Sequence, residues 1–167
     1  MKKMMFFVLA AVLSANLALA DDSFKLLNSI QDTANKAAEV GGRIWDMSHG
    51  YADRLKDAST KLDESMLMNK ILLLQMTATQ LQASAQVQLE TVILFLAFSE
   101  APESAQGQQL RTILMQRVQS MAAAKEQLAN LHEGAEILEE QDRALCREGI
   151  ALLQASISDT YSLFGVK

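Results

Sequence analysis

The chain contains one cysteine, one proline and seven glycines among its 167 residues, and only 5% of the residues are aromatic. The lone cysteine, Cys146, cannot form an internal disulfide, so the fold must be stabilised by packing alone. We expect Cys146 to be a small, partly buried apolar residue, with an intermolecular disulfide as the alternative. The scarcity of proline and glycine, together with abundant Ala, Leu, Gln, Glu and Met, predicts an all-α fold.

Motifs that carry chemistry are also missing. The sequence has no G-x-S-x-G, no glycine-rich phosphate loop and no H-E-x-x-H. His49 and His132 both lack the glutamate three residues earlier that a di-iron bundle uses. We therefore predict no catalytic residue, no metal ligand and no cofactor, in a protein that is not an enzyme. Covalent haem would need a second cysteine, although haem held by a Met and a His between helices stays open because nine methionines are present.

The first twenty residues have the layout of a secretory signal peptide. They begin with the basic MKK, continue with the apolar run MMFFVLAAVL, and end with ALA at 18–20. Small residues at these positions predict cleavage after Ala20, which makes 1–20 a signal peptide and 21–167 a single helical-bundle domain. We therefore expect an exported protein, either periplasmic or secreted.

Positive charge is scarce in the predicted mature chain. Removing Lys2 and Lys3 leaves 13 basic against 20 acidic residues, a net charge of −7. Phosphate recognition needs clustered Lys and Arg, so we expect no nucleic acid as a partner. Membrane contact stays possible but is not favoured, because an acidic chain is a poor match for an anionic lipid surface.

Sparse helix-ending signals divide the mature chain into long helices. We predict helices at 23–40, at 43–98 with a possible break near 59, and at 103–163 with a possible kink near 134. Gly41 is placed as the residue that ends the first helix, and Pro102 in the first turn of the last. The fold class that follows is all-α: an antiparallel helical hairpin, or coiled-coil-like bundle of three to four helices.

Two arrangements of these helices are open. One is a long hairpin of 43–98 against 103–163, which would place Arg147 near Asp53. The other is a compact four-helix bundle with breaks near 59 and at Gly134. The hairpin is favoured because a leucine heptad passes Gly134 without a slip, at Leu131, Leu138, Leu145 and Leu152. Small or polar residues occupy the alternate positions of this seam and would admit a close neighbour: Ala135, Asp142, Gly149 and Ser156.

The segment ILLLQMTATQLQASAQVQL at 71–89 carries no charge over nineteen residues, about the length that crosses a bilayer. Eight of these residues are Gln, Thr or Ser, which a lone helix in lipid would leave unsatisfied. The apolar residues also form two stripes. One has a 4-3 spacing at Leu67, Ile71, Leu74, Ala78, Leu81, Ala85, Val92 and Phe95, and the second includes Met66, Leu73, Met76, Ala83, Val87 and Leu94. This pattern predicts a helix with neighbours on both sides rather than a membrane span.

The segment VILFLAF at 92–98 is apolar all round a helix, whereas ESAQGQQ at 103–109, which returns from the turn, is small and polar. The returning segment cannot cover the apolar side chains, so either another segment covers them or they form a contact site. We predict partner binding at Ile93, Leu94, Leu96 and Phe98.

The resulting functional prediction is an exported, non-enzymatic helical interaction protein with an adaptor, chaperone-like or envelope accessory role. It would dock apolar helix faces on a protein partner or on a second copy of itself. Two alternatives stay open: a membrane-active helical protein that uses 71–98, and a small-ligand or haem carrier with its pocket between helices.

Overall fold

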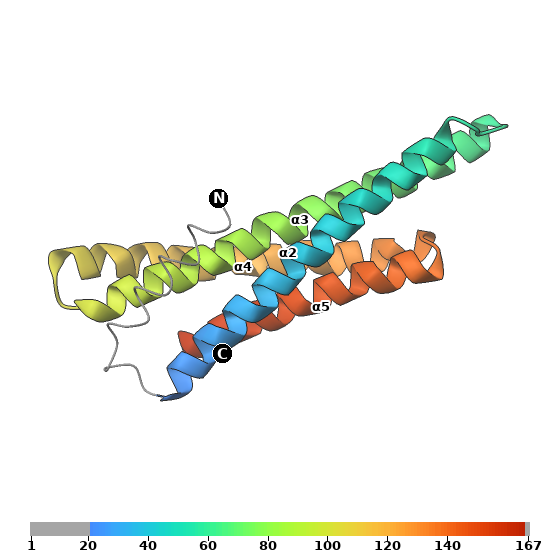
Figure 1. Ribbon diagram of the computed structural model, residues 1–167. Coiled ribbons are helices and arrows are strands. Elements are labelled where there is room, and N and C mark those ends of the chain that lie inside the picture. Colours follow the sequence, from blue (N-terminus) through green and yellow to red (C-terminus); the bar gives the residue numbers. More distant parts are fainter. Residues whose placement is uncertain (1–20, 166–167) are drawn as a thin grey trace.

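The computed structural model describes residues 21–165, which form four long helices packed against one another (Figure 1). In chain order they are α2 (Asp21–Leu55), α3 (Lys61–Glu100), α4 (Ala105–Gly134) and α5 (Glu140–Leu163), with a 3-10 turn, η1 (Ala135–Ile137), before α5. No strand occurs in this part of the chain, so the predicted all-α bundle is confirmed. The predicted signal peptide lies outside the described residues.

Side chains that cap the following helix define the turns before α3 and α4. Thr60 Oγ1 accepts a hydrogen bond from the Asp63 amide at 3.1 Å, so α3 begins directly after it. Ser104 Oγ accepts in the same way from the Gly107 amide at 2.9 Å. A Cβ on Gly107 would collide with the Ala101 carbonyl oxygen, so the turn between α3 and α4 requires glycine here.

The predicted helix end at Gly41 is wrong. α2 continues through Gly41 and Gly42 as one helix of 35 residues, because Gly41 serves close packing rather than chain reversal. A Cβ on Gly41 would lie 3.2 Å from the Ala78 carbonyl oxygen and 3.3 Å from Leu81 Cβ, both on α3. The backbones of α2 and α3 therefore approach closely at this point, whereas Gly42 has open space around its Cα.

The favoured long hairpin is also wrong, and the chain forms the compact four-helix bundle. After Gly134 the helix tightens into η1, and Leu138 is extended, with φ −82° and ψ 160°, before α5 begins. Leu131 and Leu138 are buried in the same core cluster on either side of this corner. On α5 the heptad residues Leu145 and Leu152 are only partly buried against this cluster, whereas Cys146 and Leu153 beside them are fully buried.

Ion pairs at the corner replace those predicted for the hairpin. Arg147 pairs with Glu136 rather than with Asp53, which binds Lys56 at 2.7 Å within its own helix. Glu136 also binds Arg143 at 2.9 Å. One carboxylate of η1 thus holds two guanidinium groups from the first turns of α5, which favours the reversed direction of the chain.

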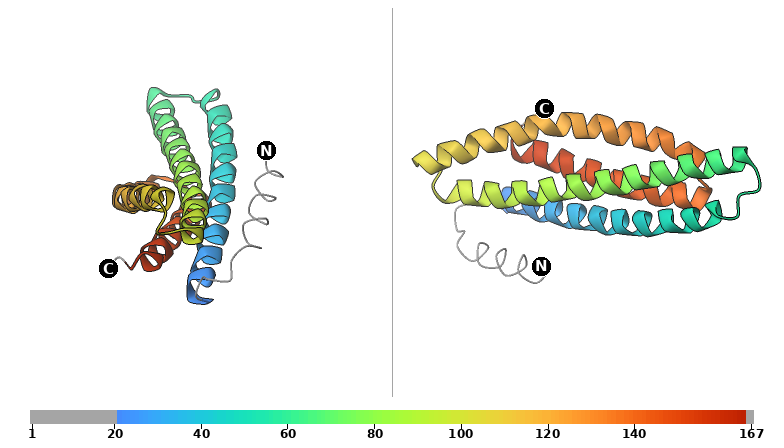
Figure 2. Two further views of the ribbon diagram at one scale, coloured as in Figure 1. Left: turned by 90° about the vertical axis from the view of Figure 1, so that its left-hand side faces the viewer. Right: turned by 90° about the horizontal axis from the view of Figure 1, so that it is seen from above.

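α2, α3 and α5 form the closely packed part of the bundle (Figure 2). The predicted first seam of α3 is buried at its centre, at Leu74, Ala78, Leu81 and Ala85. On α5, a Cβ on Gly149 would lie 2.6 Å from Leu81 Cδ1 and 2.8 Å from Val40 Cγ1. The prediction that a small residue at Gly149 admits a close neighbour is therefore confirmed.

α4 lies beside α3, on the side away from α2, and runs antiparallel to it (Figures 1 and 2). Arg117 Nη2 pairs with Glu90 Oε2 at 2.8 Å. Farther along the pair, a Cβ on Gly134 would lie 3.2 Å from Leu73 Cδ1. The second stripe of α3 thus has α4 as its neighbour, as predicted, but α4 ends at the level of Leu73 and leaves the beginning of α3 uncovered.

Among the described helices, α3 is long and apolar enough to cross a membrane, and 39% of its most apolar window is buried inside the protein. The core helix of a soluble bundle meets the same criteria of length and composition. In this fold α3 packs its first seam against α2 and α5, which supplies the neighbours that the sequence pattern predicts.

Candidate functional site

The predicted contact residues at the end of α3 do not form one exposed surface. Leu96 is 2% exposed, and it packs with Val92 against Leu27 and Ile30 of α2. The inclusion of Leu96 in a docking face is therefore corrected: the first turns of α2 cover it. Three predicted contact residues are half-buried around this cluster: Ile93, Leu94 and Phe98.

The most exposed apolar surface lies at the opposite end of α3. Five large side chains on one side of this helix are between 43% and 70% exposed, and three of them are methionines. We call this surface the Met face, and its members are Leu62, Met66, Met68, Leu72 and Met76. The second stripe, which was expected to have a neighbour, includes Met66 and Met76. Met66 lies beyond the end of α4, whereas Met76 is 61% exposed although α4 extends past it to the level of Leu73.

A hollow of about 690 Å³ adjoins the Met face, and we call it the outer hollow. Its floor is α3, including Leu72, Leu73 and Met76, and its walls are Trp45 of α2 and Leu131 of α4. The polar groups that line it are uncharged: Gln75, Thr79, Gln80, Gln127 and Asn130. The outer hollow thus combines apolar side chains with amide and hydroxyl groups, as in sites for neutral or apolar ligands.

A second, smaller hollow of about 220 Å³ lies between α3, α4 and α5, and we call it the inner hollow. Gln80 lines both hollows, so the two meet along the seam between α3 and α4. The apolar part of its lining comprises Ala83, Val87, Met121, Ala124 and Ile157, and the polar part Gln80, Ser84, Gln88 and Ser120.

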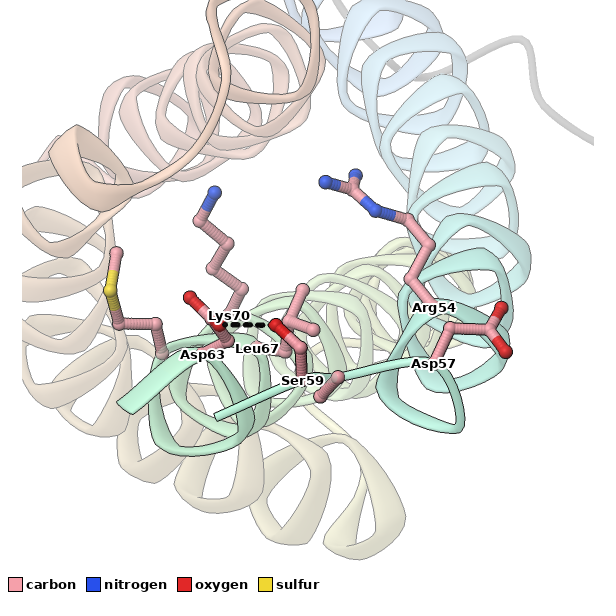
Figure 3. Close-up of a pocket in the computed structure, with 8 residues that line it drawn as sticks. Arg54, Asp57, Ser59, Asp63, Leu67 and Lys70 are labelled. Atoms are coloured by element: carbon pink, nitrogen blue, oxygen red, sulfur yellow. Dashed lines mark hydrogen bonds between the residues drawn. The ribbon is translucent and has the colours of Figure 1, made fainter. Parts of the chain in front are cut away.

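A charged pocket of about 440 Å³ opens at the turn between α2 and α3 (Figure 3). Arg54 of α2 and Lys70 of α3 both contribute to it, and both bind Glu139, at 3.1 Å and 3.7 Å. Their cationic groups also lie 4.9 Å and 5.5 Å from the centre of the Tyr51 ring. Since these cations already have partners, the pocket is better explained as a tie between the corner and the α2–α3 turn than as an anion site.

The same contacts shift the pKa values of the side chains in this cluster. The hydrogen bond from Arg54 holds the pKa of the Glu139 carboxyl below its usual range. Burial, and then the hydrogen bond that Tyr51 donates to Asp142, raise the pKa of the Tyr51 hydroxyl above its usual value. Tyr51 therefore stays protonated and links α2 to α5 at neutral pH.

Cys146 is fully buried in the core, which confirms the expectation of a buried apolar residue. Burial, and to a smaller extent the charge of Asp142, raise the pKa of its thiol to about 12. A thiol that is both buried and protonated cannot form an intermolecular disulfide in the folded chain.

The histidines and acidic residues do not converge. Within residues 21–165, no group of three or more His, Cys, Asp or Glu side chains is arranged to hold a metal ion. His49 instead packs edge-on against the Trp45 ring, with the ring centres 6.0 Å apart. Neither His49 nor His132 lines one of the two hollows.

No family model, curated protein or solved structure matches this chain.

Proposed function

We propose that this protein is an exported, non-enzymatic helical interaction protein that binds an amphipathic helix of a partner protein on the Met face. The single observation that carries the proposal is the exposure of five large apolar side chains in one continuous stretch of α3. Monomeric proteins rarely expose a group of large apolar side chains on one side of a helix without a use for it. Methionine side chains are flexible and polarizable, so a surface rich in them adapts to a helical partner.

The negative charge of the chain favours a partner helix that carries basic residues. The predicted mature chain carries a net charge of −7, whereas the outer hollow beside the Met face is lined by uncharged groups. A complementary helix would place an uncharged apolar stripe on the Met face and lysine or arginine residues along its flanks. A second copy of the chain fits less well, because two acidic surfaces would meet around the contact.

Photo-crosslinking tests this proposal with a matched pair of positions. Met68 on the Met face and Met115 on α4 are 43% and 42% exposed, so a photo-reactive amino acid at each samples solvent equally. We expect a discrete protein adduct in the cell envelope from Met68 and none from Met115. The Leu62→Glu, Met66→Glu double variant should abolish the adduct and keep its melting temperature, since both residues are mostly exposed.

Three outcomes would contradict helix docking. Equal adducts from both positions would mean that the Met face has no special affinity. Adducts only to other copies of the chain would indicate self-association. Adducts to lipid, with co-sedimentation of the protein on liposomes, would favour the membrane-active alternative, which uses the uncharged part of α3.

A further inference from the structure

The seam between α3 and α4 carries a second feature that partner docking does not explain. The inner hollow lies under α4, away from Leu62 and Met66, and it contains a buried polar side chain, Gln88. Gln88 is 1% exposed, and its Oε1 accepts a hydrogen bond from Thr160 Oγ1 at 2.7 Å. Burying an amide in an apolar setting is costly unless its hydrogen bonds are made.

The nitrogen atom of the Gln88 amide, Nε2, makes no hydrogen bond within the described part of the chain. This group carries two donors, and it is not among the fully buried atoms that lack a partner, so it is accessible from the inner hollow that Gln88 lines. The nearest comparable amide in the hollow, Gln80, uses its Nε2 to donate to Ser84 at 3.0 Å. Gln88 Nε2 can therefore donate a hydrogen bond to a group that occupies the inner hollow.

The charges around the seam restrict what that group can be. No Lys, Arg, Asp or Glu lines either hollow. The cation next along the seam, Arg117, is already paired with Glu90 at 2.8 Å. An ionised ligand would be buried without a counter-charge, which is strongly unfavourable, so charge complementarity selects a neutral ligand.

The shape of the seam restricts the ligand further. The two hollows meet at Gln80 and together follow α3 from Leu72 to Gln88, about 24 Å at 1.5 Å per residue. The lining is apolar along this path except for scattered amide and hydroxyl groups. A site of this length matches a chain rather than a compact ring system.

We infer that the α3–α4 seam binds a neutral single-chain amphiphile, such as a long-chain ester. Its carbonyl oxygen accepts a hydrogen bond from Gln88 Nε2 in the inner hollow. Its hydrocarbon chain runs past Gln80 into the outer hollow, where it contacts Leu73, Met76 and Trp45. This site shares Leu72 and Met76 with the Met face, but the two proposals are tested separately. The docking test uses Leu62 and Met66, and neither of these residues lines the outer or the inner hollow.

The single tryptophan of the chain makes the site measurable. Trp45 lines the outer hollow, so a bromine atom at the end of the bound chain lies beside it and quenches its fluorescence. The probe is methyl bromohexadecanoate with bromine on the terminal carbon, and the comparison is the bromoalkane of equal length without an ester. We expect saturable quenching by both, with about tenfold higher affinity for the ester.

Two pairs of variants separate specific binding from surface adsorption. Gln88→Leu should bring the ester affinity down to that of the bromoalkane. Thr160→Val loses the same internal hydrogen bond but leaves the amide in the hollow, so it should keep the preference for the ester. Ala124→Leu fills the inner hollow and should abolish ester binding, whereas Ala123→Leu on the exposed side of α4 should not.

The inference is overturned if the wild-type protein binds ester and bromoalkane equally, since Gln88 would then contribute nothing. It is equally overturned if quenching does not saturate, or if Ala124→Leu binds like Ala123→Leu. Higher affinity for bromohexadecanoic acid in its ionised form than for its methyl ester would contradict the neutral site. Partner crosslinking at Met68 can succeed or fail whichever of these results is obtained.

Discussion

α5 and α4 are neighbouring helices on opposite sides of one corner, yet they pack in different ways. α5 buries seven of its 24 residues, among them Gly149 and Ser156, which are small enough for other helices to approach closely. α4 buries six of its 30 residues and borders both hollows. In this bundle α2, α3 and α5 supply most of the close packing, while α4 covers α3 incompletely and leaves the two hollows beside it.

The largest expected effect of this difference in packing is on stability, and two leucine-to-alanine substitutions in the core, one on α5 and one on α4, test it. Leu153 on α5 and Leu128 on α4 are both fully buried. We expect Leu153→Ala to lower the free energy of unfolding by about 4 kcal/mol and Leu128→Ala by about 2–3 kcal/mol. The reason is that α4 can shift toward α3 and reduce the cavity, whereas α5 is held on two sides. Urea titrations measure both values, and equal losses would contradict the looser packing of α4.

A smaller effect is expected from glycines that differ only in their surroundings. Gly42→Ala adds a methyl group in open space within a helix, so it should raise the free energy of unfolding by about 0.5–1 kcal/mol. Gly149→Ala gains the same helix propensity but forces a methyl group against Val40 and Leu81, and it should lower stability by about 1–2 kcal/mol.

Thermal melts of the two alanine variants report the sign of each change. Gly41→Ala is the intermediate case, because its neighbours lie at 3.1–3.3 Å and include a backbone oxygen that cannot rotate away. A stabilised Gly149→Ala variant would show that the contact of α5 with α2 and α3 is not close in solution.

The smallest effect concerns the ion pair that holds α4 on α3. Hydrogen bonds from Gln86, and then from Arg117, lower the pKa of the Glu90 carboxyl. A lowered folded-state pKa means that this stabilisation is present above the unfolded pKa and is lost as the pH falls through the folded pKa. Because the Glu90 side chain is 44% exposed, solvent screening limits the contribution to less than about 1 kcal/mol.

Chemical denaturation from pH 7 down to pH 3 tests this contribution against the Glu90→Gln variant. The wild-type protein should lose slightly more stability than the variant over this range, and hydrogen exchange should show the extra opening in α4 rather than in α5. Identical pH profiles for the two proteins would mean that Glu90 and Arg117 do not hold α4 in place.

Much of the candidate site was beyond sequence-based prediction, for a reason visible in α3. The first stripe of this helix was predicted correctly, with a buried seam through Leu74 and Leu81. Of the second stripe, which was expected to have a neighbour, Met66, Met76 and Ala83 are exposed, whereas Leu96, which was expected to be available, is buried. A stripe states neither how far its neighbour extends nor how completely that neighbour covers it. Gln88 gave no signal, because a glutamine between two stripes is equally consistent with solvent exposure.

The sequence by itself determined the all-α class, the apolar and uncharged character of α3, and the need for small residues at positions such as Gly149. These properties depend on composition and on spacing along one helix, which are local. Only the tertiary structure decided that Gly41 packs against Ala78 rather than ending a helix, and that the chain reverses after Gly134. Each of those outcomes depends on contacts between residues far apart in the chain, and the periodicity of a single helix does not specify which partner it meets or where that partner ends.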